Sequence, residues 1–409
     1  MLLLAACSKP AVKEPGPAAP CSCAPPVTAP AIPIPETQKI PPAVKPEPAV
    51  PDYSLLRPSN WDALNGFAED NLAAGWSAWL QSCSTLVNRP PWQAACTAAS
   101  QLTNLDNSTI QNYFRQYFDV YQATNADGSD TGLITGYYQP VLQGSRVKTA
   151  KYRYPLYGKP SDLITVELAS LYPELAHKRI RGRLSEQKLV PYYSRDQIET
   201  QPSPLQGQEL LWVDDSIDLF FLQIQGSGIV QLEDGERVQV GYADQNGYTY
   251  RSIGRVLIDR GEITADNASM QGIKNWARNH PDKLHDLLNS NPSYVFFREL
   301  PSGLPGPLGA LGVPITGQRS VAVDPRYIPL GAPLFLATTY PNSSEPLNQL
   351  MLAQDTGGAI KGGVRADFYW GAGDEAGMRA GAMKEPGKIW VLLPKGFPLA
   401  KPSLPAPAK

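Results

Sequence analysis

Residues 353–371, AQDTGGAIKGGVRADFYWG, place two aspartates on either side of a glycine-rich turn. Asp355 follows an apolar run, and Asp367 stands directly before Phe368, Tyr369 and Trp370. A carboxylate among apolar residues is costly unless it is paired or hydrogen-bonded. Three interpretations therefore remain open for this stretch: a catalytic pair, a metal site, or the acids of a solvated loop.

Asp324, in VAVDPRYIPLG (321–331), is a third aspartate in a matching β-context. Nearby Gly and Pro residues indicate tight turns, so we expect all three acids at strand ends. Aspartate often caps such turns by accepting from backbone N–H groups, which is the favoured interpretation for Asp324. For Asp355, capping and a functional role are evenly balanced. Asp367 favours function, because aromatic neighbours desolvate its carboxyl, raise its pKa and let it donate a proton.

Other chemistries fit this stretch less well. The chain has only three histidines (His177, His280 and His285), which weakens a histidine triad or a His-rich metal site. DTGGAIKG supplies one carboxylate and a lysine, whereas a hard cation takes several oxygen ligands. Asp-Thr-Gly is also the hallmark triplet of aspartic proteases, but a three-residue match is weak evidence. We expect no metal and no cofactor.

Composition limits the class of protein. The 409 residues allow two or three domains. A net charge of −2 gives no excess of cations for binding nucleic acid. No apolar run is long enough to span a bilayer. The 19 Tyr and eight Trp suit carbohydrate surfaces, and they suit a protein core equally well.

The first residues, MLLLAACSKP, indicate export. Leu4-Ala5-Ala6-Cys7 resembles a bacterial lipobox, although a basic segment before it is missing; the alternative is a chance apolar start. Cys7 would be lipidated, and Ser8 after it fits sorting to the outer membrane. We assign residues 1–7 to the signal remnant and 8–51 to a Pro/Ala-rich tether. Cys83 and Cys96 are expected to form a disulfide in an oxidising periplasm, the alternative being two buried thiols.

Periodicity indicates helices over 58–122, then mostly β-runs. In STIQNYFRQYFDVYQA (108–123), one helical stripe would carry the aromatic residues from Tyr113 to Tyr121, with Ser108 as N-cap. Residues 218–243 (DLFFLQIQGSGIVQLEDGERVQVGYA) are predicted as a hairpin. Helices are expected again over 250–291, with Gly261 ending the first, and β-runs from 294 onward. The chain is therefore predicted to be α+β and mainly β. Insertion of one β-module into another is compatible with this order of elements, and periodicity alone does not show it.

Two upstream motifs carry polar groups on glycine-permitted turns. TGYYQP (135–140) and QIQGSG (223–228) supply the Tyr, Gln and Ser side chains that recognise sugar hydroxyls. Taken alone, each motif is better explained as a structural turn.

Several long stretches together resemble the MltA family of lytic murein transglycosylases. They are TGYYQP, FFLQIQGSG, YADQNGYTYRSIGRVLIDRGEIT, NPSYVFFRE, GVPITGQRSVAVDPRYIPLGAPLF and AQDTGGAIKGGVRADFYWGAGDEAGMRAG, which fall between about residues 55 and 395. The resemblance implies a double-ψ β-barrel domain with the three aspartates, interrupted by a second, inserted β-barrel, and a glycan groove between them. The first domain would be 52–137 plus 295–409, and the insertion 138–294.

By the same resemblance, Asp367 would be the catalytic acid, with Asp355 and Asp324 as supporting acids. The substrate-binding residues would be Thr135, Gly136, Tyr137, Tyr138, Gln225, Gly226, Ser227 and Tyr369. One departure concerns KGGVRADFYWG (361–371), which is one residue longer than in the enterobacterial form and leaves the geometry of the two acids open.

The resemblance implies cleavage of the β-1,4 bond between N-acetylmuramic acid and N-acetylglucosamine, with a single Asp forming a 1,6-anhydro product. Two alternatives are an inverting glycan hydrolase with Asp355 as base, and a non-catalytic peptidoglycan-binding lipoprotein. The expected partners are peptidoglycan strands, the outer membrane through a lipid anchor, and cell-wall synthesis or division proteins. The expected location is the periplasmic face of the outer membrane.

Overall fold

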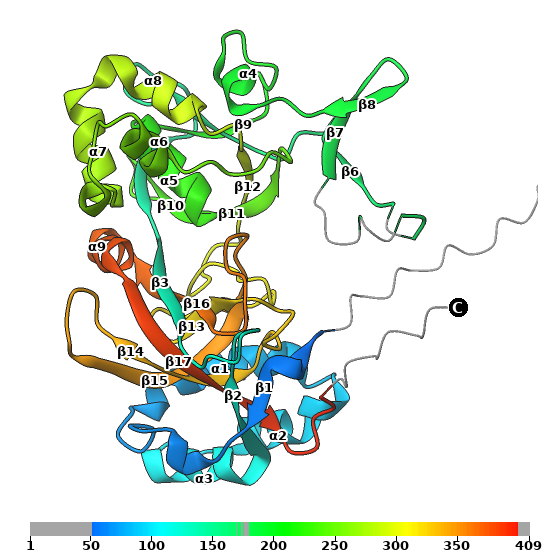
Figure 1. Ribbon diagram of the computed structural model, residues 1–409. Coiled ribbons are helices and arrows are strands. Elements are labelled where there is room, and N and C mark those ends of the chain that lie inside the picture. Colours follow the sequence, from blue (N-terminus) through cyan, green and yellow to red (C-terminus); the bar gives the residue numbers. More distant parts are fainter. Residues whose placement is uncertain (1–50, 169, 173–174, 176–179, 400–409) are drawn as a thin grey trace, which may run out of the picture. The chain divides into compact units, whose positions relative to one another are not determined.

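A computed structural model describes residues 51–399 except 169, 173–174 and 176–179 (Figure 1). The signal remnant, nearly all of the tether, Cys7 and His177 lie outside the described residues. Among the described residues, no helix is both long and apolar enough to cross a membrane.

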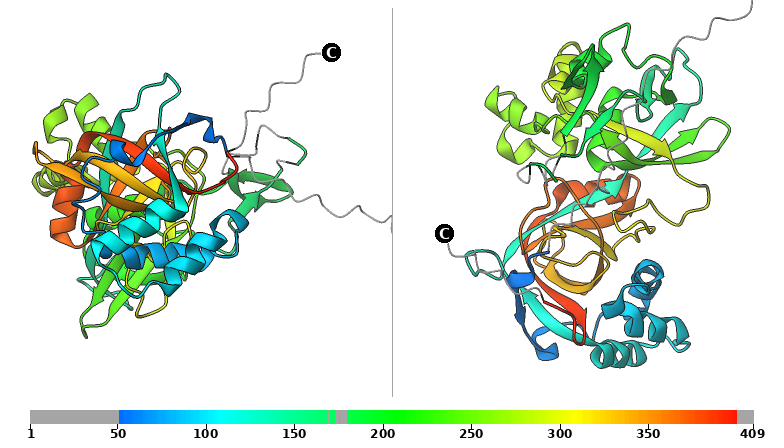
Figure 2. Two further views of the ribbon diagram at one scale, coloured as in Figure 1. Left: turned by 90° about the horizontal axis from the view of Figure 1, so that it is seen from below. Right: turned by 90° about the vertical axis from the view of Figure 1, so that its right-hand side faces the viewer.

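The N-terminal segment packs three helices on a β-barrel. Its elements are η1 (Tyr53–Leu55), β1 (Leu56–Pro58), η2 (Trp61–Ala63), α1 (Leu72–Leu86), α2 (Pro90–Gln101), α3 (Asn107–Tyr117) and β2 (Phe118–Ala123). One apolar cluster joins Trp79 and Phe114 of the helices to Phe335 and Leu392 of the barrel. In Figure 2, these blue and cyan helices lie against the orange and red strands.

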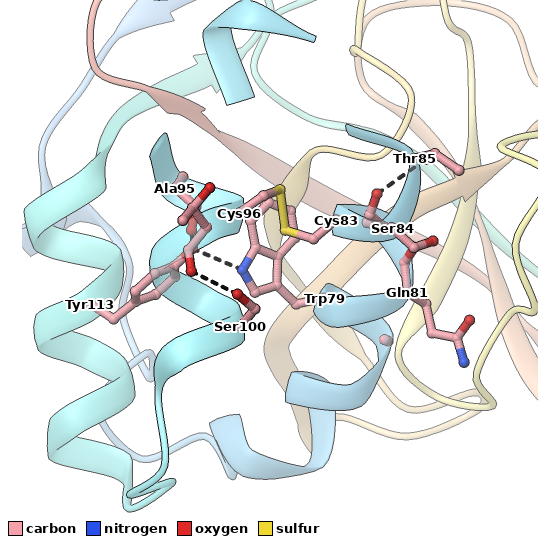
Figure 3. The surroundings of a disulfide bond; sticks show 12 residues. Trp79, Gln81, Cys83, Ser84, Thr85, Ala95, Cys96, Ser100 and Tyr113 are labelled. Atoms are coloured by element: carbon pink, nitrogen blue, oxygen red, sulfur yellow. Dashed lines mark hydrogen bonds between the residues drawn. A yellow bond between two sulfur atoms is a disulfide. The ribbon is translucent and has the colours of Figure 1, made fainter. Parts of the chain in front are cut away.

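A disulfide between Cys83 and Cys96 ties α1 to α2 (Figure 3). Beside it, the Trp79 indole donates to the Tyr113 hydroxyl at 3.0 Å, and that hydroxyl donates to the Ala95 carbonyl at 2.8 Å. All three helices are therefore held together at this point, by a covalent link and by a buried hydrogen-bond chain.

The prediction of one continuous helical stripe through Tyr121 was wrong. Helix α3 ends at Tyr117, and the next residues form β2, which pairs with β1 and β17. Pairing with distant strands outweighs the helical period of the local sequence. In β2 the side chains of Phe118 and Val120 are buried in the core, and Asp119 between them is exposed. The N-cap is Asp106, which accepts from Thr109 N; Ser108 donates to Asp106 instead of capping.

Six strands close into a barrel. They are β3 (Gly132–Gln139), β13 (Ser320–Val323), β14 (Pro333–Thr339), β15 (Pro346–Asp355), β16 (Arg365–Ala372) and β17 (Lys384–Pro394). The order β17-β14-β15-β13-β16-β3 closes because β3 also pairs with β17. β13 runs parallel to β15, and β3 runs parallel to β16. Helix α9 (Asp374–Ala382) follows β16.

A second six-stranded sheet lies within the insertion, in the order β12-β11-β10-β4-β9-β5. Its strands are β4 (Val141–Ser145), β5 (Tyr154–Tyr157), β9 (Glu209–Val213), β10 (Ser227–Leu232), β11 (Arg237–Gln245) and β12 (Val295–Glu299). A bridge between Gly158 and Phe297 joins its two end strands, so this sheet also curls into a barrel.

The remaining elements of the insertion surround this sheet. β6 (Ile164–Val166), β7 (Ile180–Ser185) and β8 (Lys188–Pro191) form a separate sheet. The helices are α4 (Arg195–Glu199), α5 (Ser216–Gln225), α6 (Ile253–Asp259), η4 (Ala265–Asn267), α7 (Met270–Asn279) and α8 (Pro281–Asn289). The predicted α+β, strand-rich class is confirmed.

The predicted hairpin over 218–243 is correct only in its second part. Residues 227–245 form the hairpin β10–β11, but the preceding residues form helix α5. Asp215 caps that helix by accepting from Ile217 N and Asp218 N, and Gly226, at φ +77°, ends it. A short apolar run such as LFFL does not distinguish strand from helix by periodicity.

Candidate active site

The barrel brings Asp355 and Asp367 to opposite sides of one residue. Ala322 of β13 is in register with Asp355 on β15 and with Asp367 on β16. Because neighbouring strands lie about 4.8 Å apart, the two acid backbones are about 10 Å apart. Ala322 packs here with the side chains of Tyr137, Ile315, Ile360 and Tyr369. The two acids therefore flank a small apolar cluster that contains two tyrosines.

Among the described residues, Asp367 has a single hydrogen-bond donor. Thr135, its register partner on β3, donates from Oγ1 to Asp367 Oδ1 at 2.5 Å. Arg365 Nη2 donates in turn to Thr135 Oγ1 at 2.9 Å. No described residue is hydrogen-bonded to Oδ2 of Asp367. Burial raises the pKa of Asp367; Thr135 and the Arg365 cation oppose the rise, and the Asp355 charge adds to it.

Asp355 is held more firmly. Its Oδ2 accepts from the Tyr137 hydroxyl at 3.0 Å, and its Oδ1 accepts from Ala310 N at 2.9 Å and Thr356 N at 2.8 Å. Burial raises the pKa of Asp355, and these three donors offset only part of that rise. The Tyr137 ring packs on Tyr369 with 5.1 Å between centroids, so both tyrosines help to fix this carboxyl.

Asp324 is hydrogen-bonded to neither of the other two acids and caps a turn. Its buried carboxyl accepts from Arg326 N at 3.2 Å and forms an ion pair with Nη2 of Arg326 at 3.0 Å. It also accepts from Gly362 N at 3.0 Å, which ties the turn to the loop joining the two acids. Burial opposes ionisation, but these donors outweigh it and hold the pKa of Asp324 below its ordinary value.

The predicted binding residues fall into separate groups. Thr135 and Tyr137 contact the acids, whereas Gly136 and Tyr138 alternate to the other face of β3. Gly136, Tyr138 and Gln225 line a cavity of about 210 Å³, where Gln225 Oε1 accepts from Tyr138 N at 3.1 Å.

Three further predicted residues lie outside that cavity. Gly226 ends α5 and Ser227 begins β10. Tyr369 lines a different cleft, of about 470 Å³. The predicted binding residues are therefore divided between the acid face of β3, where Tyr369 packs on Tyr137, and the cavity on the other face of that strand.

Gly136 has a steric reason to be glycine. A Cβ at this position would lie 2.8 Å from both the Ala380 Cα and the Trp370 ring. Close packing of α9 and β16 against β3 therefore depends on the missing side chain, and this packing keeps Thr135 beside Asp367.

Arg365 was missed by the sequence reasoning. It lies two residues before Asp367 on β16, and residues i and i+2 of a strand share a face. Besides Thr135, its guanidinium donates to the carbonyls of Leu133 at 3.2 Å and Ala366 at 2.6 Å. The strand period alone could have placed this cation beside the candidate acid.

A second Asp-Thr-Gly triplet occurs at residues 130–132, and an aspartic protease needs two such triplets. In such proteases, two carboxyls share a proton at about 3 Å. Asp130 instead accepts from Lys388 Nζ at 2.9 Å and Gln122 Nε2 at 3.0 Å, whereas Asp355 is bonded to Tyr137. The two triplets do not form a dyad. Within the described residues, no three His, Cys, Asp or Glu side chains gather as they would around a metal ion.

Known proteins match most of this chain. Residues 133–298 match the family model described as the MltA specific insert domain, and residues 319–393 match the 3D domain. Membrane-bound lytic murein transglycosylase A of Escherichia coli K12 is 36% identical over 287 residues, which are 68% of this chain and 70% of that protein.

Solved structures agree with these matches. MltA from Neisseria gonorrhoeae is 39% identical with a TM-score of 0.75, covering 84% of this chain and 93% of that one. E. coli MltA with bound chitohexaose is 30% identical with a TM-score of 0.56, covering 78% of this chain and 89% of that one. With both family domains matched and relatives of this identity over most of its length, the chain belongs to the MltA family of lytic murein transglycosylases.

Proposed function

We propose that this protein cleaves the β-1,4 bond between N-acetylmuramic acid and N-acetylglucosamine in peptidoglycan without water, leaving 1,6-anhydromuramic acid. Its family supports the coarser statement, a peptidoglycan lytic transglycosylase. One observation carries the finer proposal: Asp367 has a raised pKa, one oxygen held by Thr135 and the other without a donor among the described residues. A carboxyl in that state can remain protonated and present its proton to a substrate.

Asp367 would act twice. The protonated carboxyl gives its proton to the glycosidic oxygen as the bond to C1 breaks and an oxocarbenium-like state develops. The carboxylate then accepts the proton of the muramoyl C6 hydroxyl, whose oxygen attacks C1. Because the nucleophile belongs to the substrate, proximity replaces the second carboxyl that ordinary glycosidases need. An intermediate pKa suits a group that must both give and take a proton.

Asp355 would support this reaction and not act as a base. Three donors already hold its two oxygens, so its carboxyl is poorly placed to take a proton from water. It is better suited to accept one hydrogen bond from a sugar hydroxyl and to raise the pKa of Asp367 through its charge. The rival, an inverting hydrolase, requires Asp355 to activate a water molecule. Asp324 would act more remotely, by holding the loop between the two acids.

The location and domain limits belong to the same proposal. Cys7 would carry the lipid anchor, and residues 8–51 would tether the enzyme to the periplasmic face of the outer membrane. The sequence places the limits of the insertion at 138–294, but β12 (Val295–Glu299) pairs with β11, so we assign it to the insertion as well. Residues 52–137 and 300–409 would then form the catalytic domain, 138–299 the insertion, and the glycan would lie between them. Cavities lined from both parts support this arrangement. The name "membrane-bound" of the curated relatives fits an envelope location.

Digestion of purified sacculi tests the reaction. We expect mass spectrometry to find muropeptides ending in 1,6-anhydromuramic acid. We expect Asp367→Asn to lower the rate of their release by about 10²–10⁴-fold, which is the range of general acid–base catalysis. Reducing-end sugars without anhydro product would instead favour the hydrolase. Wild-type protein that binds sacculi and releases nothing would favour a binding protein.

A further inference from the structure

A cleft of about 470 Å³ continues the barrel face that carries the acids. Its lining includes Gln139 and Tyr369 from the barrel and Arg237 and Gln239 from β11. Gln139 lies two residues after Tyr137 on β3, and Tyr369 lies two residues after Asp367 on β16, so both share the acid face. Gly371, also in the lining, lies four residues beyond Asp367, which is about 13 Å of strand.

Within the described chain, one buried oxygen and one guanidinium in this cleft have no partner. The amide of Gln239 donates from Nε2 to the Leu304 carbonyl at 2.9 Å, while its buried Oε1 accepts no hydrogen bond within the described chain. Arg237 lies two residues earlier on the same face of β11, is exposed, and has no described partner for its guanidinium. A buried acceptor without a donor is costly, and a free guanidinium is suited to bidentate binding of a carboxylate.

These groups do not match the glycan backbone. In intact peptidoglycan the lactyl carboxyl of each muramoyl residue is held in the amide bond to its stem, so the glycan backbone carries no charge and offers nothing to a free cation. The peptide stem attached to each muramoyl residue carries both carboxylates and amide N–H groups. A stem of about four residues reaches about 13 Å when extended, which is long enough to enter a cleft that begins at Tyr369 and includes Gly371.

Resting on the proposed function, we propose that this cleft binds the peptide stem of the muramoyl residue at the active site. Arg237 binds a stem carboxylate, and Gln239 Oε1 accepts from a stem amide N–H. The cleft thereby makes the enzyme prefer glycan strands that still carry their peptides. Arg237 contributes to specificity and takes no part in bond cleavage.

The test compares glycan strands bearing tetrapeptide stems with the same strands after an amidase has removed the stems and the freed lactyl carboxyls have been converted to amides. We expect wild-type kcat/KM to be about 10-fold higher on the stem-bearing strands, as one charge-assisted hydrogen bond would give. For Arg237→Gln, the ratio of the two values falls towards one, and Arg237→Lys retains part of the preference. Arg255→Gln removes an exposed arginine outside the cleft and keeps the wild-type ratio.

A binding measurement separates this inference from the proposed reaction. Soluble N-acetylmuramoyl-tetrapeptide is titrated into Asp367→Asn protein, with and without Arg237→Gln, and we expect the double variant to bind about 10-fold more weakly. A wild-type ratio near one, or a ratio unchanged by Arg237→Gln, would overturn the peptide cleft. If wild-type protein cleaved neither substrate, the proposed reaction would fail, and the titration would still decide whether the cleft binds the stem.

Discussion

Arg365, Thr135 and Asp367 form a chain of hydrogen bonds in which each donor points towards the carboxyl. Such a chain favours the ionised form of Asp367 and opposes the effect of burial. The balance between the two leaves the pKa of Asp367 raised. At the scale of single residues, the pKa of Asp367 therefore depends in part on Arg365, which is not itself hydrogen-bonded to the carboxyl.

Replacing Arg365 by Gln should alter the pH dependence of the reaction. Removing a nearby cation raises the pKa of Asp367, and the acid must be protonated to act, so the alkaline limb of kcat/KM should move to higher pH. We also expect kcat to fall by about 10-fold, part of the contribution of acid–base catalysis, because Thr135 loses its support. Arg365→Lys keeps the cation and should keep the limb in place. An unmoved limb in Arg365→Gln would show that this arginine is only structural.

Asp367→Asn should stabilise the fold at neutral pH while it removes activity. A carboxyl whose pKa is raised on folding adds stability below its unfolded pKa of about 3.9, and that stability is lost as pH rises through the folded value. Asparagine does not ionise, so the variant avoids the loss. We expect a gain on the order of 1 kcal/mol at pH 7 that disappears near pH 3.5, measured by thermal unfolding. Exposed Asp119→Asn serves as control, and an equal gain there would contradict this explanation.

The helices α1 and α2 meet at the Cys83–Cys96 disulfide, which closes a short loop. Replacing both cysteines by alanine should lower the free energy of unfolding by about 3 kcal/mol, because the unfolded chain gains freedom. Denaturant unfolding of wild-type and variant protein, each with and without reductant, measures this. Reduced wild type should match the variant. Equal stability of oxidised wild type and variant would mean that the packing of Trp79 and Tyr113 alone holds the helices.

Among the elements, β3 has the widest role. It closes the barrel by pairing with both β16 and β17, brings Thr135 to Asp367 and Tyr137 to Asp355, and leads directly into β4 of the insertion. Its alternation sends one row of side chains to the acids and the other to the cavity shared with Gln225. A single strand thus links the candidate chemistry to both parts of the described chain.

At the scale of the whole molecule, both barrels have apolar cores within residues 51–399. We therefore expect protein comprising residues 51–409 to cleave soluble glycan strands at about the wild-type rate, within about two-fold. It should no longer sediment with the membrane fraction, whereas the full chain should. Loss of cleavage in the 51–409 protein would mean that the first 50 residues take part in the reaction, and unchanged sedimentation would refute the anchor at Cys7.

The α+β class, most strands from β12 onward and helix α6 with its stop at Gly261 could be predicted from local pattern, because turns and periodicity are properties of neighbouring residues. The end of α3 and the start of α5 could not. Phe118 continues a helical period, and pairing of β2 with the distant β17 makes it a strand. Residues 218–225 carry an apolar run that fits either structure.

The sequence by itself determined the candidate acids, the family and the chemistry to expect, because these depend on residue types in a recognisable order. Only the tertiary structure decided how the acids differ. Thr135 is hydrogen-bonded to Asp367 although the two are 232 positions apart in the sequence, and Tyr137 is hydrogen-bonded to Asp355 at a separation of 218. Both pairs meet because β3 closes the barrel. The tertiary structure also gave the Asp324 carboxyl Arg326 and Gly362 as its hydrogen-bond partners, and neither of the other two acids. Burial and long-range hydrogen bonds set the pKa of each carboxyl, and neither is a property of the local sequence.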